Sequence, residues 1–209
     1  MGSVSVRNVS KDYVLGRTIV RARKVLPEGG WEALDQRQRR LVLRAAWIIT
    51  EADGGASQDE ITALDHLARF LGLGSDVKAS GITGADKGEV LRELRQGPRD
   101  LSFAHHLYAG TYLVGMADGV LLETERTALV ELARASGVDA ASCEALEGDL
   151  HGILYEELLE TVFKDRVVSS RERQILNATR KLLGLSEEVA TGIEEAYRER
   201  LVRGDMGAY

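Results

Sequence analysis

The feature that most constrains the fold of this chain is a short acidic motif that occurs three times with the same internal spacing. In each copy an Asp is followed by a Glu seven residues later and by a Gly nineteen residues later. A spacing that is kept through three copies indicates a chain built from similar structural units. The three sets are Asp53, Glu60 and Gly72, then Asp118, Glu125 and Gly137, then Asp165, Glu172 and Gly184.

Each copy also carries the pattern of an amphipathic helix. Apolar residues follow the Glu mainly at intervals of three, four and seven, which places them on one face of a helix. The final Gly suits the left-handed position that ends a helix. In the first two copies an apolar stretch precedes the Asp, and a Gly follows it directly. The sequence therefore predicts an all-α helical bundle, built from a duplicated unit of helix, Asp-Gly turn and helix, with a third half-unit appended.

The remaining sequence predicts further helices and the limits of the domain. We expect a helix from about 31 to 52, one capped by Asp100 or Ser102, two over 140–150 and 153–163, and a last one capped by Ser186. The predicted organisation is a basic arm with an amphipathic helix at 1–30, a helical domain at 31–203 with turns at 53–60, 118–125 and 165–172, and a tail at 204–209.

Charge is unevenly distributed along the chain. Residues 1–44 carry a net charge of +6 and residues 45–209 a net charge of −12, within a total of −6. Two interpretations of the basic arm remain open: it packs on its own acidic body, or it contacts an anionic partner such as a membrane surface. Nucleic acid is not an expected partner, because no basic face with interleaved aromatic residues occurs and the body would repel phosphate.

Several classes of protein are excluded by what the sequence lacks. The single cysteine, Cys143, permits neither an internal disulfide nor a cysteine zinc site. No apolar run approaches the roughly 20 residues that span a bilayer, and the start of the chain does not read as a signal peptide. Phosphate loops, dinucleotide fingerprints and the common hydrolase motifs are also missing. We therefore expect a cytoplasmic protein that is not an enzyme.

At its repeated turns the chain resembles the TerB-like family of tellurite-resistance and stress proteins. The resemblance rests on Ala52-Asp53-Gly54 with Glu60, and on Ala117-Asp118-Gly119 with Glu125, and it covers roughly residues 38–150, with an extension to about 200. It implies an all-helical fold, no catalysis, and divalent-cation binding by the acidic turns. Position by position, the metal candidates are Asp53, Glu60, Asp118 and Glu125. The third copy departs from the pattern, because Arg166 stands where the other copies have Gly.

The chemistry of these residues allows two interpretations. Carboxylates suit hard cations such as calcium or magnesium, although Ile49 and Val114 stand where an EF-hand loop needs its first ligand. Alternatively, the Glu side chains only cap helices. Ser57 with Glu60, and Ser169 with Glu172, fit the capping box, in which Ser and Glu each bind a free backbone amide. Leu122 holds the cap position of the second copy, so Glu125 has no Ser to reciprocate.

The function expected from the sequence is a non-catalytic binding or regulatory module of a bacterial stress or tellurite-resistance type system. It would bind a divalent cation weakly at its acidic turns and act with a protein partner. The rival hypothesis is a helical protein-interaction scaffold or homodimerisation domain in which the turns only cap helices. A metal-dependent hydrolase is a third hypothesis, disfavoured because no His lies at metal-ligand spacing.

Overall fold

The chain is all-α in the part that the structure describes, which confirms the predicted class. The structure is a computed structural model, and it describes residues 18–27, 29–74, 84–97, 99–164 and 167–204. These residues contain nine helices and no strand. None of the described helices is long and apolar enough to cross a membrane. By their contacts the residues divide into two compact units, one within 10–147 and the other within 148–209.

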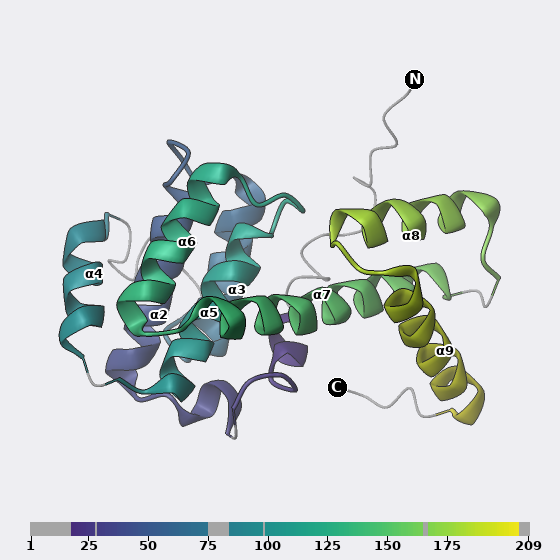
Figure 1. The fold of residues 1–209 in the computed structure, drawn as a ribbon, viewed down its shortest axis with the longest axis horizontal. Coiled ribbons are helices and arrows are strands. Elements are labelled where there is room, and N and C mark those ends of the chain that lie inside the picture. The colour runs from purple at the N-terminus through teal and green to yellow at the C-terminus, as the bar shows by residue number, and fades with distance from the viewer. Residues whose placement is uncertain (1–17, 28, 75–83, 98, 165–166, 205–209) are drawn as a thin grey trace. The chain divides into compact units, whose positions relative to one another are not determined.

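The first unit is organised around two packed helices, α2 and α5. These two helices make the most extensive helix–helix contact of the chain, and α3 packs against both. The helix α6 also contacts α2 and α5, and α4 lies against α2 and α6 (Figure 1). The bounds are η1 Gly30–Ala33, α2 Gln36–Thr50, α3 Gln58–Phe70, α4 Lys87–Gln96, α5 Leu101–Gly115 and α6 Glu123–Ser136.

The basic segment before α2 packs into this unit where the structure describes it. Residues 18–22 are helical, and the apolar side chains of Ile19, Ala22 and Leu26 are all buried. The indole Nε1 of Trp31 donates a hydrogen bond to the Ile19 carbonyl at 3.2 Å. The apolar side of this segment therefore faces the protein's own core. The part of the predicted basic arm that precedes residue 18 lies outside the described residues.

The helix expected over 31–52 proves shorter. It begins at Gln36, after the separate 3-10 helix η1. Asp35 starts it, because its side chain accepts from the Gln38 amide at 2.8 Å while the Gln38 side chain accepts from the Asp35 amide at 2.9 Å. This is a capping box that the sequence prediction overlooked.

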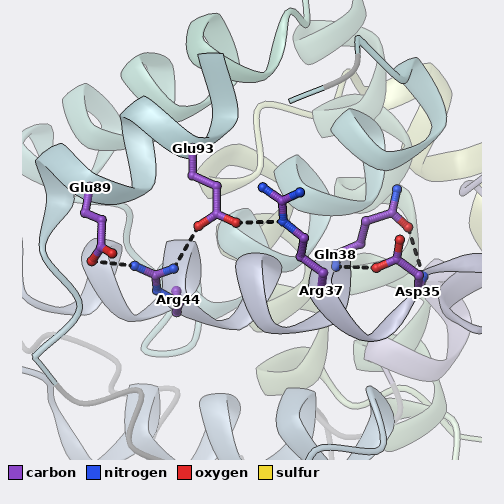
Figure 2. Close-up of polar contacts among 6 residues, drawn as sticks. All are labelled: Asp35, Arg37, Gln38, Arg44, Glu89 and Glu93. Atoms are coloured by element: carbon purple, nitrogen blue, oxygen red, sulfur yellow. Dashed lines mark hydrogen bonds and ion pairs between the residues drawn. The ribbon is translucent and has the colours of Figure 1, made fainter. Parts of the chain in front are cut away.

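An ion-pair network holds α4 against α2. Arg44 of α2 donates to Glu89 and Glu93 of α4, and Arg37 donates to Glu93, with all three N···O distances at 2.9 Å (Figure 2). Val90 and Leu94 of α4 are buried. These charged side chains and the buried apolar ones together fix α4 on α2.

The predicted caps are confirmed at the described helix ends. Ser57 and Glu60 form the capping box that starts α3, and Ser169 and Glu172 form the one that starts α8 (Ser170–Leu182). Of the two caps considered for α5, Asp100 is the one used, since its Oδ1 accepts from the Ser102 and Phe103 amides. The predicted stop glycines also adopt positive φ, 69° at Gly72, 92° at Gly137 and 63° at Gly184.

The second unit contains most of α7 (Ala140–Val162), with α8 and α9 (Glu187–Arg203). The prediction of two helices over 140–150 and 153–163 is wrong, because α7 runs through both without a break. Gly148 and Gly152 both lie inside this continuous helix. An interior glycine costs only about 1 kcal/mol relative to alanine, and the buried side chains of Leu150 and Ile153 hold this part of the helix. Ser186 caps α9, as expected.

Candidate functional site

The two Asp-Gly turns follow the two central helices, one after α2 and one after α5. Gly54 has φ 106° and Gly119 has φ 94°, a left-handed region that favours glycine. Asp53 and Asp118 are both exposed. The side chain of Asp118 accepts a hydrogen bond from the Val120 amide at 2.9 Å, so this Asp shapes its own turn.

The Glu of each motif reaches back to the start of its own helix. Glu60 Oε2 accepts from the Ser57 amide at 2.7 Å, and Glu125 Oε2 accepts from the Leu122 amide at 2.6 Å. In the first copy the Glu60 amide in turn donates to Ser57 Oγ at 3.2 Å. Leu122 has no side-chain acceptor, so the second copy has only half of a capping box, as the sequence predicted.

Glu60 and Glu125 meet in the interior of the first unit. Their exposed fractions are 5% and 3%, and Glu60 is one of the groups that raise the pKa of Glu125, so the two carboxyl groups interact. The remaining oxygen of Glu60, Oε1, is buried and finds no hydrogen-bond partner among the described residues. A buried carboxylate oxygen without a donor is costly, and a nearby proton or positive charge lowers that cost.

The buried position of Glu125 raises the pKa of its carboxyl group. Burial is the main cause that raises the pKa of Glu125, to about 7 from an ordinary value of 4.5. The Leu122 amide opposes this rise, while the hydrogen bond to Glu60 and the charges of Glu60 and Asp118 add to it. Near neutral pH the pair therefore readily holds a proton, which turns one of the two acceptors into a donor.

Close packing at the ends of α2 and α5 brings the turns together. Gly115 is the last residue of α5, and a Cβ there would lie 3.0 Å from Ile49 Cγ2 and 2.7 Å from Leu121 Cδ1. Gly110 is equally crowded, since its Cβ would lie 2.9 Å from Val42 Cγ1. These two glycines let the central helices approach closely, and the helices that follow them bring Glu60 and Glu125 into contact.

The four predicted metal candidates are therefore only partly brought together. Glu60 and Glu125 are adjacent, and Asp118 is near enough for its charge to act on Glu125. Asp53 is not among the groups whose charge acts on the pKa of Glu125. Within the described residues no group of three or more His, Cys, Asp or Glu side chains is arranged to hold a metal ion. In the third copy the Glu172 side chain accepts hydrogen bonds from the amide and hydroxyl of Ser169, while Asp165 and Arg166 lie outside the described residues.

Sequence reasoning missed the contact between copies, since it treated each turn as a separate site. The repeated spacing could have indicated that contact. When two related helix pairs pack against each other, equivalent positions can be brought face to face, and Glu60 and Glu125 are equivalent by their spacing from Asp.

A second polar cluster also went unpredicted, and it occurs once in each unit. The hydroxyl of Tyr108 donates to Glu147 Oε1 at 2.5 Å, and Arg126 lies 3.7 Å from the same oxygen. In the other unit Tyr155 donates to Glu194 Oε1 at 2.9 Å, and Arg173 pairs with Glu194 at 2.8 Å. Both Tyr–Glu pairs are separated by 39 residues along the chain.

The two clusters follow the repeat, because each member recurs at the interval that separates Asp118 from Asp165. In both units the Tyr belongs to the helix before the acidic turn, the Arg to the helix after it, and the Glu to the next helix. Burial and the nearby Glu raise the pKa of both tyrosines, so the hydroxyls keep their protons and act as donors. The clusters therefore tie three successive helices together in each unit.

A surface cleft of about 330 Å³ lies beside the first turn. The end of α2 lines it with Ile48, Glu51 and Ala52, and α4 and α6 contribute Lys87 and Thr124. None of the four metal candidates lines this cleft. Comparison of the chain with protein-family models, with curated proteins and with solved structures finds no match.

Proposed function

We propose that this protein is a non-catalytic, TerB-like binding or regulatory module whose acidic turns bind a divalent cation weakly. The observation that carries the proposal is the buried contact between Glu60 and Glu125, in which Glu60 Oε1 has no partner among the described residues. By the resemblance of its turns, the module belongs to a bacterial stress or tellurite-resistance type system. It would act in the cytoplasm and through a protein partner.

The residues present fit such an ion in the chemistry of their oxygen atoms. Carboxylate oxygens are the preferred ligands of calcium and magnesium, and the pair offers two carboxylates with Asp118 close by. A bound cation would supply the positive charge that the two facing acceptors lack. The protein's own contribution is to hold both Glu side chains in place, since each is fixed by a backbone amide at its helix start.

A thermal melt of chelator-treated protein tests this function. Calcium, magnesium, manganese and zinc are added one at a time, with Glu125→Gln as the variant. A cation that binds only the folded state stabilises it by about 2.7 kcal/mol at a hundredfold excess over its dissociation constant. We expect at least one of these ions to raise the melting temperature of the parent protein and not that of Glu125→Gln. An unchanged melt at millimolar concentrations of all four ions would refute cation binding.

The scaffold hypothesis is favoured by a different observation, the capping boxes at Ser57 and Ser169. If capping is the whole role of the turns, the protein acts as a helical interaction surface or forms a homodimer. Ser57→Ala should then lower stability by about 1 kcal/mol, equally with chelator and with metal. Light scattering over a range of concentrations tests the homodimer, and vesicle binding at low salt tests a membrane contact of the basic arm.

A further inference from the structure

The buried imidazole of His106 contacts the backbone of two different elements. His106 belongs to α5, and its exposed fraction is 0%. Its Nδ1 lies 2.6 Å from the Ser102 carbonyl oxygen of the same helix, and its Nε2 lies 2.8 Å from the carbonyl oxygen of Gly30 in η1. A carbonyl oxygen can only accept a hydrogen bond, so both contacts need a donor on the ring. The ring can supply two donors only as a cation, with a proton on each nitrogen.

Loss of one proton would break one of these two contacts. A neutral imidazole has one N–H and one lone pair, so a lone pair would face a carbonyl oxygen at hydrogen-bond distance. Two acceptors in this position repel each other, and a buried acceptor without a donor is costly. The Ser102 carbonyl is fixed within α5 itself, whereas Gly30 belongs to the short helix η1. The contact with Gly30 is therefore the one that can open.

The Gly30 contact holds the basic segment, residues 18–27, through the neighbouring Trp31. The Trp31 ring packs edge-on against the His106 ring, with the two centroids 5.5 Å apart. Its indole Nε1 donates to the carbonyl of Ile19 in the basic segment, whose apolar side is buried. The protonation state of His106 therefore bears on whether η1 and the basic segment stay docked on α5.

Charged and titratable side chains lie next to this contact, by a described bond or by sequence, on four elements. They are Asp100 and His105 of α5, Glu32 of η1, Arg21, Arg23 and Lys24 of the basic segment, and Arg39 of α2. Glu32 pairs with Arg23 at 3.4 Å, and both side chains are exposed. Asp100 uses its Oδ1 on the Ser102 and Phe103 amides. Within the described residues no carboxylate forms an ion pair with His106, so the two carbonyl oxygens are the contacts that favour its charged form.

We propose that His106 is a proton-dependent switch, which holds η1 and the basic segment on α5 while both ring nitrogens are protonated and releases them when one proton is lost. Histidine is the side chain that ordinarily changes charge between pH 5 and 8. Docking of the segment takes up a proton, so docking is strongest at low pH and weakens as pH rises. Release would expose the apolar side of the segment together with its cations. This inference goes beyond the proposed function and does not depend on the acidic turns.

Nuclear magnetic resonance of the full chain, labelled with ¹⁵N-histidine, tests the charge of the ring between pH 5 and pH 8. The ¹⁵N shifts distinguish a ring with two N–H groups from either neutral tautomer, and His106→Gln assigns the signal. We expect both His106 nitrogens to be protonated at pH 5 and one to lose its proton as pH rises. A ring that stays in one state over the whole range, neutral or doubly protonated, would overturn the switch.

Hydrogen exchange of the same samples tests the release. Protection of the amides in residues 18–27, corrected for the intrinsic pH dependence of exchange, is compared with that of α2. We expect opening of the segment to increase with pH, by at most about tenfold per pH unit for one proton, and to follow the titration of the ring. Protection that stays constant in the parent, or opening that does not follow the ring, would overturn the proposal even if no variant folds.

His106→Gln should leave the segment open to the same extent at every pH, because glutamine does not titrate. His105→Gln is the matched control, since it removes the adjacent, half-buried histidine of α5 and should keep the pH dependence of the parent. A pH-dependent opening that survives His106→Gln, or that disappears in His105→Gln, would assign the effect to a group other than His106.

Discussion

Glu125 shows how one side chain can serve two purposes in this fold. One oxygen caps the start of α6 through the Leu122 amide, while the carboxyl group also meets Glu60. Both glutamates are almost wholly buried, and each is fixed at the first turn of its helix. Burying two carboxylates without a paired cation is costly. Binding of a proton or a cation by this pair is therefore favourable.

Stability should depend on pH through Glu125. A carboxyl group whose pKa is raised in the folded state binds its proton more tightly there than in the unfolded chain. Its contribution is therefore fully present below pH 4.5 and is lost as pH rises to about 7. Because each pKa unit corresponds to about 1.4 kcal/mol, the loss should be on the order of 1 to 3 kcal/mol. Urea denaturation with chelator at pH 5, 6, 7 and 8 measures it.

Glu125→Gln should remove this part of the pH dependence, and Glu172→Gln should keep it. The informative quantity is the difference in unfolding free energy between parent and variant at each pH, because other carboxylates add their own slopes. A difference that stays constant from pH 5 to pH 8 would show that Glu125 does not titrate in this range.

At the scale of elements, the contact of α2 with α5 controls the site. The two helices approach closely at Gly110 and Gly115, and the turns that follow them carry the capping glutamates. The site is thus a product of helix packing, and a residue that never touches a carboxylate can still disrupt it. Gly115 is the best placed for such an effect, because it is the last residue of α5.

Gly115→Ala should destabilise the protein by about 1 to 3 kcal/mol through overpacking. The added methyl would lie 3.0 Å from the fully buried Ile49, which has little room to move. Gly148→Ala is the matched control, since nothing lies within 4 Å of its Cβ and it sits on an exposed part of α7. That change should stabilise by roughly 0.5 to 1 kcal/mol. Chemical denaturation of both variants checks the opposite signs, and equal effects would contradict the packing argument.

At the scale of the whole molecule, the two units are built on the same plan. Each has a helix, an acidic turn or its counterpart, a second helix and a third helix, tied together by a Tyr, a Glu and an Arg. The helix α7 belongs to both plans: its first part supplies Glu147 to one cluster, and its later part supplies Tyr155 to the other. The third copy is thus more complete than the half-unit that its sequence predicts.

Removing one cluster should loosen one unit more than the other. Tyr155→Phe deletes a buried hydrogen bond worth about 1 kcal/mol and leaves Glu194 with its Arg173 partner. Hydrogen exchange should then rise more in α8 and α9 than in α2 and α5, because opening is local to cooperative units. Tyr108→Phe is the reciprocal variant and should give the reverse pattern. A uniform rise in both variants would mean that the chain opens as one unit.

Local signals in the sequence predicted local structure well. The capping boxes at Ser57 and Ser169 and the cap at Ser186 depend on residues three positions apart, so the sequence displays them directly. The break predicted inside α7 failed because helix-breaking tendency at Gly152 is weak compared with the burial of its neighbours. The contact of Glu60 with Glu125 could not be derived in the same way, since it depends on how separate helices pack.

The meeting of Glu60 and Glu125 also limits how the two turns can diverge. Duplicated segments usually become free to accumulate changes separately, but here each copy forms the environment of the other. A charge reversal such as Glu60→Lys would set an ammonium group near Glu125 and give that buried carboxylate a charge partner within the protein. A second change at Glu125 would then leave that ammonium group without its partner. A suppressor of damage to one turn is therefore to be sought in the other.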